Sequence, residues 1–161
     1  MKALIQLVKN CTLTIDYSDT PYSHIDKGLL IFLGVKKGDN ENDAIKLAKK
    51  IAGLRIFEDE NGKMNLSCTD EKVNGKFLVV SQFTLCGDCS HGRRPDFFNA
   101  AHPDIAEPLY EFFKDRLREE AIKLGAKGDQ LIESGKFGAD MQISFTNLGP
   151  VTFIIESDEL K

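Results

Sequence analysis

Two short segments of the chain combine polar side chains with turn-forming residues at the ends of expected strands. The first follows the apolar run Phe77–Val80, and it reads Ser81-Gln82-Phe83-Thr84-Leu85. The second reads Asn147-Leu148-Gly149-Pro150-Val151-Thr152. Hydroxyl and amide groups after a buried strand could bind a substrate, and an X-Pro bond can adopt the cis form in a tight turn. Both segments also fit ordinary turns, because Ser, Thr, Gly and Pro satisfy local backbone groups.

The secondary structure predicted around these segments indicates an α+β fold, with residues 1–161 forming one domain. The order is strands, helix, strands, helix, strands, without a linker, a repeat or a low-complexity tract. Enrichment in β-branched and aromatic residues predicts six strands. Their ranges are Lys2–Val8, Thr12–Tyr17, Gly28–Val35, Phe77–Phe83, Met141–Thr146 and Val151–Glu156.

Apolar residues at helical spacing predict a first helix from Glu41 to Arg55. Its buried face is expected to consist of Ala44, Leu47, Ala48 and Ile51. The opposite face is basic, which usually indicates a solvated surface and sometimes an anion-binding one. The residues of that face are Lys46, Lys49 and Lys50.

A second helix is expected to begin with a capping box, in which Asp104 caps and Glu107 reaches back. Pro108 falls in the first turns, where it removes only one early hydrogen bond. The apolar stripe that follows ends before Gly125, and it consists of Tyr110, Phe113, Leu117, Ala121 and Leu124. Both helices should cover a mostly antiparallel, barrel-like sheet.

Composition indicates a globular protein that needs no cofactor to fold. The chain has 161 residues, a formal net charge of −4 and 42% hydrophobic residues, which is enough to bury a core without a metal or a disulfide. No apolar run approaches the ~20 residues of a membrane span. The first eight residues read as a strand and lack the core and cleavage site of a signal peptide. We therefore expect a cytoplasmic protein with no membrane partner.

The four cysteines are expected to be free thiols, because their spacing is not that of a disulfide framework. Cys86 and Cys89, followed by His91, have the look of half a zinc knuckle. A closed zinc site needs four ligands, however, and no second pair follows at a suitable spacing. The loop also lacks the strand-to-helix setting of a redox CxxC motif. No metal is expected.

The loop from Cys86 to Ala101 combines adjacent arginines with aromatic residues. Arg93 and Arg94 present guanidinium forks suited to phosphates, and Phe97 and Phe98 present rings on which bases could stack. The alternative is structural, with both rings fastening the loop to the core and Arg94 pairing with Asp96. Overall acidity does not exclude nucleic acid, because binding follows local charge.

The two opening segments occur in the order found in D-aminoacyl-tRNA deacylases, and the chain resembles that family over nearly its whole length. Five further blocks look like the family: residues 29–35, 54–59, 62–67, 94–97 and 135–141. Two departures concern Leu148, where the family commonly has Asp, and the segment Asp16–Asp26, which is unusual in length and composition. The first leaves the Gly-Pro dipeptide itself intact.

The resemblance implies a homodimer that hydrolyses the ester between a D-amino acid and the terminal adenosine of tRNA. It places the oxyanion hole at the backbone N–H groups around Phe83 and Thr84, with the 2′-hydroxyl of the substrate assisting. The Thr84 hydroxyl could be a nucleophile only if a base activated it. The three histidines stand in polar loops without a patterned partner, at His24, His91 and His102. The remaining substrate-binding residues that we expect are Ser81, Gln82 and Met141.

The same resemblance assigns chirality to Gly149 and Pro150, a cis pair that enters the pocket of the other subunit. A rigid carbonyl there would collide with an L-side chain and leave room for a D-side chain. Glycine has no side chain to reject, so glycyl-tRNA, such as tRNA-Ala mischarged with glycine, should also be hydrolysed. Contacts to backbone imply broad tolerance of D-side chains.

Two other classes of function stay open at this point. The chain could be a catalytically inactive module that binds the tRNA 3′ end, or a purely structural dimer. Loss of the ester distinguishes the enzyme from the module. Salt-dependent binding to tRNA distinguishes the module from the structural dimer. Neither DNA nor a cofactor is expected as a partner.

Overall fold

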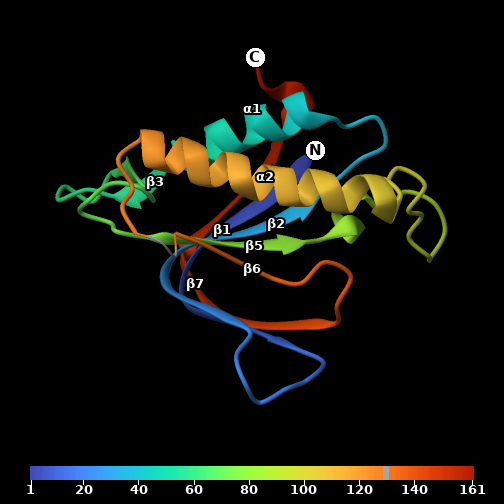
Figure 1. The fold of residues 1–161 in the computed structure, drawn as a ribbon, viewed down its shortest axis with the longest axis horizontal. Helices are drawn as coiled ribbons and strands as arrows, with labels where there is room; N and C mark the ends of the chain where they lie inside the picture. Colours follow the sequence, from blue (N-terminus) through green and yellow to red (C-terminus); the bar gives the residue numbers. More distant parts are fainter. Residues whose placement is uncertain (129–130) are drawn as a thin grey trace.

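The computed structural model describes residues 1–128 and 131–161, and its elements form two layers (Figure 1). A curved sheet makes one layer, and the helices α1 and α2 lie side by side over one of its faces. In chain order the elements are β1 Lys2–Ile15, β2 Ser23–Gly34, α1 Glu41–Ala52, β3 Arg55–Glu58, β4 Met64–Ser67, β5 Lys76–Ser81, the 3₁₀ helix η1 Phe83–Cys86, α2 Pro103–Lys123, β6 Ile132–Ser134, β7 Met141–Glu156 and the 3₁₀ helix η2 Ser157–Glu159.

Five strands form a mixed sheet in the order β6-β5-β2-β1-β7. Strand β1 pairs antiparallel with β2 and β7, whereas β5 pairs parallel with β2 and β6. The sheet is therefore mixed, with its longest pairings antiparallel, as expected, and two shorter pairings parallel. The two parallel pairs explain why long crossovers that contain α1 and α2 lie between these strands. Among the described residues the edge strands β6 and β7 do not pair, so the barrel is not closed.

Strand boundaries differ from the predicted ones mainly where the chain bends. The first two predicted strands are one strand, β1, whose register shifts between Lys9 and Thr12 and whose Asn10 has φ 49°. The last two are likewise one strand, β7. Strand β5 ends at Ser81 and not at Phe83, because the chain turns there into η1. The short strands β3, β4 and β6 were not expected from the sequence.

Both predicted helices exist, and their apolar faces lie in the main core. In α1 the four predicted residues are fully buried. In α2 the predicted stripe is buried except for its last member, since Leu124 is 53% exposed. Helix α2 begins at Pro103 without a side-chain cap, so the capping box predicted for Asp104 is wrong. A capping box stands instead at the start of α1, between Asn40 and Asp43.

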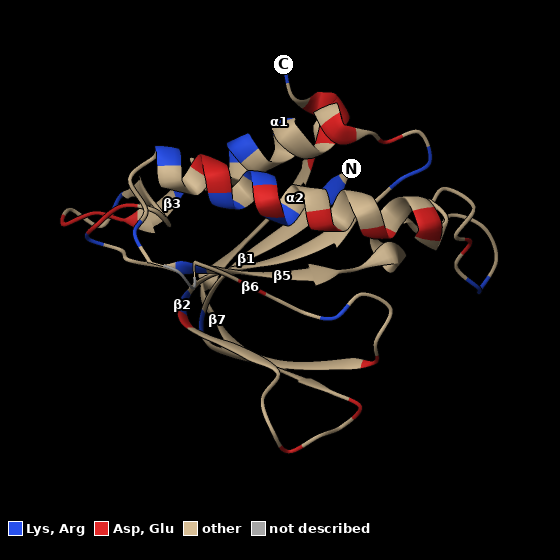
Figure 2. Cartoon of the chain, in the orientation of Figure 1, with Lys and Arg blue, Asp and Glu red and all other residues tan. Residues whose placement is uncertain are grey.

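The outer surface of the helical layer carries charges of both signs along its length, while the strands are largely uncharged (Figure 2). Several of these charges pair within α2, for example Lys114 with Glu111 at 2.8 Å. None of the described helices is long and apolar enough to span a membrane. Below the sheet, the opposite face buries a second, smaller core that includes Leu13, Ile25 and Val80.

Candidate active site

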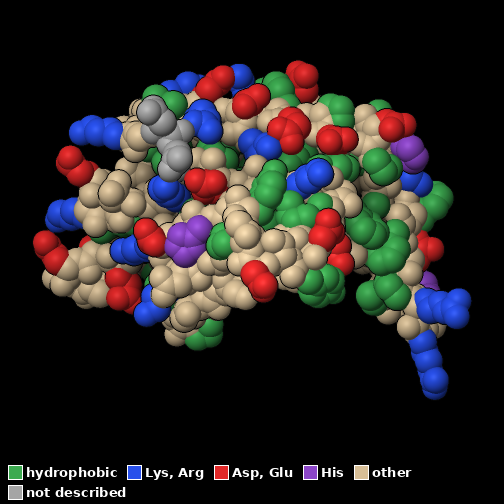
Figure 3. All heavy atoms as spheres, turned by 60° about the horizontal axis from the view of Figure 1, so that its bottom comes forward, with side chains coloured by type: hydrophobic (Ala, Val, Ile, Leu, Met, Phe, Trp, Pro, Cys, Tyr) green, Lys and Arg blue, Asp and Glu red, His purple; other side chains and the backbone are tan. Residues whose placement is uncertain are grey.

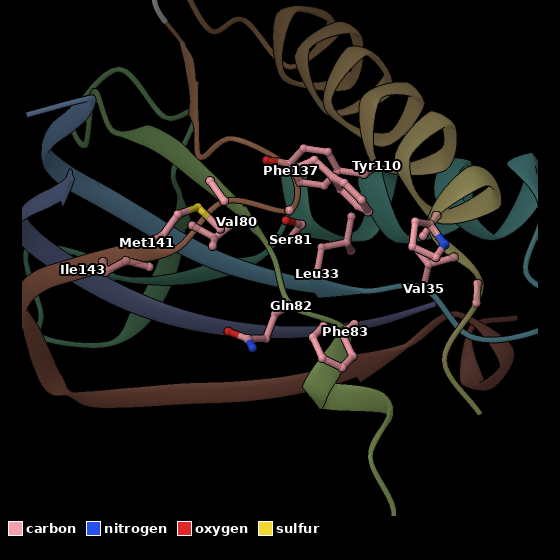
Figure 4. A pocket seen from close by; sticks show the side chains of 15 residues that line it. Leu33, Val35, Val80, Ser81, Gln82, Phe83, Tyr110, Phe137, Met141 and Ile143 are labelled. Atoms are coloured by element: carbon pink, nitrogen blue, oxygen red, sulfur yellow. The ribbon is translucent and has the colours of Figure 1, made fainter. Parts of the chain in front are cut away.

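A cavity of about 550 Å³ opens where β5 ends (Figure 4). This volume lies within the roughly 300–1,000 Å³ that small-molecule sites occupy. The walls come from β2, the end of β5, the start of α2 and the segment 137–143. Their lining residues are mostly apolar, and the polar side chains among them belong to Ser81, Gln82 and Tyr110.

An aromatic pair forms one wall of the cavity, and Figure 4 shows Tyr110 and Phe137 side by side above Ser81. Their ring centroids are 5.8 Å apart. The Tyr110 hydroxyl lies 2.9 Å from the Val79 carbonyl oxygen and 3.3 Å from that of Gly135. Burial raises the pKa of Tyr110, so the hydroxyl keeps its proton and remains a donor.

The segment 135–140, which contains Phe137, is held by the Val79 carbonyl as well. The Gly135 N–H donates to the Val79 oxygen at 2.9 Å, so β5, α2 and the segment 135–140 meet at one atom. Met141 and Ile143 close the cavity from the other side, as Figure 4 shows. Met141, predicted to bind substrate, therefore lies in the cavity.

The polar end of the cavity is the turn from β5 into η1. Gln82 precedes the 3₁₀ helix and donates its N–H to the Leu33 carbonyl at 2.8 Å. Phe83 and Thr84 are the first two residues of η1, where N–H groups have no acceptor within a helix. Among the described residues, no hydrogen bond outside helices and strands uses either N–H group. Two unpaired donors thus stand beside the cavity.

The Thr84 side chain is not arranged as an activated nucleophile. Its hydroxyl oxygen accepts a hydrogen bond from Gln82 Nε2, which is an amide and cannot serve as a base. Thr84 is exposed and does not line the cavity, whereas Ser81, Gln82 and Phe83 do. The predicted backbone role of Thr84 is therefore compatible with its position, but its side chain lies outside.

The histidines do not supply the missing base. His91 and His102 are exposed, as predicted. His24 lies on β2 and not in a loop, with Nδ1 2.8 Å from Thr12 Oγ1 and Nε2 2.9 Å from Asp26 Oδ1. This chain of three side chains was missed in the sequence, but it is exposed and lies outside the residues that line the cavity.

The loop that carries the arginines is closed at its base by a pair of backbone hydrogen bonds between Asp88 and Asp96. Arg93 and Arg94 lie at the exposed tip, and among the described residues neither forms an ion pair. Among the described residues no ion pair joins Arg94 to Asp96, and Asp96 Oδ1 accepts the Phe98 N–H at 2.6 Å. Figure 3 shows basic side chains that protrude from one end of the molecule, next to a hydrophobic surface.

The two phenylalanines of this loop have different roles. Phe97 packs edge-on against Phe83 with 5.0 Å between ring centroids, so it fastens the loop to η1 as the structural alternative predicted. Phe98 is 73% exposed, and the Lys37 ammonium lies 3.5 Å from its ring centroid. One ring is thus used in packing, and the other remains accessible beside a cation.

The CxxC pair is divided between two environments. Cys86 is buried at the end of η1 and its thiol donates to the Val35 carbonyl, whereas Cys89 is exposed. Burial raises the pKa of Cys86, which disfavours the thiolate that a metal or a redox reaction requires. The description of both as loop thiols holds only for Cys89. Within the described residues, no group of three or more potential metal ligands is found.

Gly149 and Pro150 are exposed on β7, and the peptide bond between them is cis, as expected. Neither residue lines the cavity of its own chain. The sequence therefore identified the polar end of the cavity and Met141, but it missed the wall of Tyr110 and Phe137. In the sequence, Tyr110 fits an apolar stripe of a helix, and no pattern distinguishes Phe137 within the block 135–141.

Solved structures are similar to this chain in fold. A structure described as a c-Myc DNA unwinding element binding protein is 36% identical, covers 97% of this chain and 98% of its own, and has a TM-score of 0.84. A probable eukaryotic D-amino acid tRNA deacylase is similar in fold, with a TM-score of 0.79 over 96% of this chain and 98% of its own at 16% identity.

The sequence family follows from a second comparison. The family model described as D-Tyr-tRNA(Tyr) deacylase matches residues 4–156, and the chain belongs to this family. A D-aminoacyl-tRNA deacylase of Thermosipho africanus is 48% identical over 160 residues, covering 99% of both chains. One from Thermus aquaticus is 50% identical over 159 residues, covering 99% of this chain and 97% of the relative.

The Tyr110 hydroxyl gives a test of how the cavity wall is held. In Tyr110→Phe the Val79 and Gly135 carbonyls lose a buried donor, so we expect the free energy of unfolding to fall by about 1–2 kcal/mol. Urea denaturation measures this change. Tyr22→Phe is the matched control, because Tyr22 is 55% exposed and should change stability little. Equal stability of the Tyr110 and Tyr22 variants would contradict the role of this hydroxyl.

Proposed function

We propose that this protein hydrolyses the ester of D-aminoacyl-tRNA and releases the free D-amino acid and the tRNA. Family membership and relatives named for this activity support the proposal. The observation that carries it is the pair of unpaired N–H groups at Phe83 and Thr84, beside an apolar cavity. Such donors can stabilise the oxyanion of an ester that is already activated.

The cavity suits the terminal adenosine of the substrate. Its aromatic and apolar wall can accept a flat base, while Ser81 and Gln82 stand at the polar end where the ribose and the ester would lie. Stacking of a base on aromatic rings is a general mode of recognition for unpaired nucleotides. The ester carbonyl would then lie near the start of η1.

Hydrolysis at this site needs no side-chain nucleophile. Water attacks the ester carbonyl and gives up a proton, and the carbonyl oxygen becomes an oxyanion that accepts hydrogen bonds from the N–H groups of Phe83 and Thr84. Collapse of this intermediate breaks the bond to the ribose oxygen, which leaves with the tRNA and takes up a proton. The 2′-hydroxyl of the terminal ribose is the nearest group of the substrate that can assist proton transfer. This scheme fits the engagement of the Thr84 hydroxyl by the Gln82 amide.

We infer that the active unit is a homodimer in which Gly149 and Pro150 of one subunit enter the cavity of the other. Two observations support this inference. Gly149 and Pro150 are both exposed, and neither lines the cavity of its own chain. A second subunit could therefore receive the pair in its cavity.

A backbone pair in that position would explain selectivity for the D-enantiomer. A rigid carbonyl that faces the Cα atom leaves room for a D-side chain and collides with an L-side chain. Glycyl-tRNA, including tRNA-Ala mischarged with glycine, would be accepted because glycine has no side chain. Since the discriminating contacts are to backbone atoms, we expect a broad range of D-side chains to be hydrolysed.

The remaining parts of the proposal concern partners and location. Residues 1–161 would act as one deacylase domain, because the family match spans nearly all of them. The cytoplasm is the expected compartment, since aminoacyl-tRNA is formed and used there. No cofactor is required by the scheme, and DNA is not proposed as a partner. A module that binds the tRNA end without hydrolysis is not favoured by relatives that are named as deacylases.

One assay tests this function directly. Matched D-tyrosyl-tRNA, L-tyrosyl-tRNA and glycyl-tRNA are incubated with the protein, and loss of each ester is followed. We expect the D-tyrosyl and glycyl esters to be lost and the L-tyrosyl ester to persist. Binding of all three without ester loss would support the inactive module, and equal loss of D and L esters would contradict the steric proposal.

Two substitutions of Thr84 distinguish a catalytic role of its backbone N–H group from a role of its side chain. Thr84→Ala keeps the N–H group and should retain activity within about tenfold, whereas Thr84→Pro deletes the donor and should lower kcat at least about a hundredfold. Single-turnover hydrolysis of D-tyrosyl-tRNA measures both. Circular dichroism and gel filtration of each variant control for folding. An alanine variant as inactive as the proline variant would restore the side chain as nucleophile.

The exposed arginines should act through phosphates of the tRNA. The double variant Arg93→Ala/Arg94→Ala should bind more weakly and reduce the slope of log K against log salt by about one to two. Its D-to-L selectivity should not change. Lys49→Ala/Lys50→Ala removes the same charge from the exposed side of α1 and serves as the control.

Titrations with D-tyrosyl-tRNA analogues that resist hydrolysis, at several salt concentrations, give these slopes. Duplex DNA of similar charge is the competitor that tests the expected absence of DNA binding. A salt slope that is the same in the arginine variant and the wild type would remove Arg93 and Arg94 from the tRNA-binding surface.

A further inference from the structure

Strand β7 carries a large bulge at the place where Gly149 and Pro150 lie. In the register with β1, Asn147 is the partner of Val8, and the next pair joins Thr152 to Gln6. Residues 148–151 of β7 therefore face Leu7 alone. An ordinary bulge adds one residue, so this one interrupts the ladder of backbone hydrogen bonds more than usual.

The side chain of Asn147 spans the base of this bulge. Its Nδ2 group donates to the Leu7 carbonyl on β1 and to the Val151 carbonyl at the far end of the bulge, each at 3.0 Å. A primary amide has two N–H donors, and both are used here. One side chain therefore supplies donors to two carbonyls at the place where the ladder is interrupted.

The two ends of the bulge are fixed and its centre is free to protrude. Leu148 and Val151 are partly buried and pack against the main core, whereas Gly149 and Pro150 are exposed. Gly149 has φ +111°, and a Cβ atom there would meet Val151 Cγ2 at 2.6 Å. The exposed pair therefore forms a narrow tip, whose direction depends on the residues at its base.

We propose that Asn147 is the positioning residue of this tip, and that it determines how strictly L-aminoacyl-tRNA is rejected. This inference rests on the proposed steric role of Gly149 and Pro150. Asn147 does not touch the substrate in this scheme. It acts by holding Val151 to Leu7, so that the tip projects from a closed base and its carbonyl cannot yield to an L-side chain.

Steric rejection is sensitive to such support. A blocking group excludes a ligand only if its displacement costs free energy. Widening the base of the bulge would break the two Asn147 hydrogen bonds, so these bonds oppose displacement of the tip. A D-substrate makes no collision with the tip, so its hydrolysis does not depend on this stiffness. Loss of the amide should therefore alter selectivity more than activity.

Two variants of similar volume remove the donors. Asn147→Asp replaces them by carboxylate oxygens that face two carbonyls, and Asn147→Leu replaces them by methyl groups. For both we expect kcat/KM for L-tyrosyl-tRNA to rise at least about tenfold, with the value for D-tyrosyl-tRNA within about threefold of the wild type. Thr14→Val is the matched control, since it removes another side-chain hydrogen bond between β1 and β7, from Thr14 to Gln142.

A merely structural role would lower both rates together and leave their ratio unchanged, and that result would overturn the proposal. Failure of both Asn147 variants to fold would also overturn it, because the amide would then hold the sheet and not only the tip. Gly149→Ala tests the steric role of the tip separately from the positioning role of Asn147, because the added methyl group displaces the tip directly. If that variant still spared L-tyrosyl-tRNA, the steric role of the tip would fail. If only the Asn147 variants spared it, the positioning role alone would fail.

Discussion

The carbonyl oxygen of Val79 is the point on which the geometry of the cavity depends. It accepts hydrogen bonds from the Gly135 N–H and from the Tyr110 hydroxyl, and so uses both of its lone pairs within the core. Strand β5, helix α2 and the segment before β7 are thereby fixed relative to one another. Because this joint is buried, the shape of the cavity is set before any ligand arrives, which is the condition for preorganised catalysis.

The spacing of apolar residues in the sequence predicted the two helices and most of their buried faces. The four residues predicted for the buried face of α1 are all buried, because apolar residues at helical spacing lie on one side of the helix. Ala52, which is also buried, was not predicted. The sheet was predicted less well. Parallel pairing of β5 with β2, and the unity of β7, are properties of contacts between distant segments, and no pattern within one strand encodes them.

The candidate site likewise contains residues that the local sequence pattern predicted and residues that only distant contacts identify. Ser81 to Thr84 and the Gly-Pro pair were visible in the sequence because they break the pattern of a strand, and functional sites often violate such patterns. Tyr110 was not visible as a site residue, because an aromatic residue in an apolar stripe fits the core equally well. Its hydroxyl becomes informative only when the acceptors on β5 and on the segment after β6 are known.

In the proposed homodimer, a Gly-Pro tip that serves the cavity of the other subunit would link accuracy to protein concentration. The donors at the start of η1 belong to each chain, whereas the element proposed to exclude L-side chains would come from a second one. By mass action, dilution below the dissociation constant of the dimer would leave open cavities that keep their donors. Dissociation would then yield not an inert protein but an indiscriminate esterase, so tight association of the subunits would protect the cell's correctly charged tRNA.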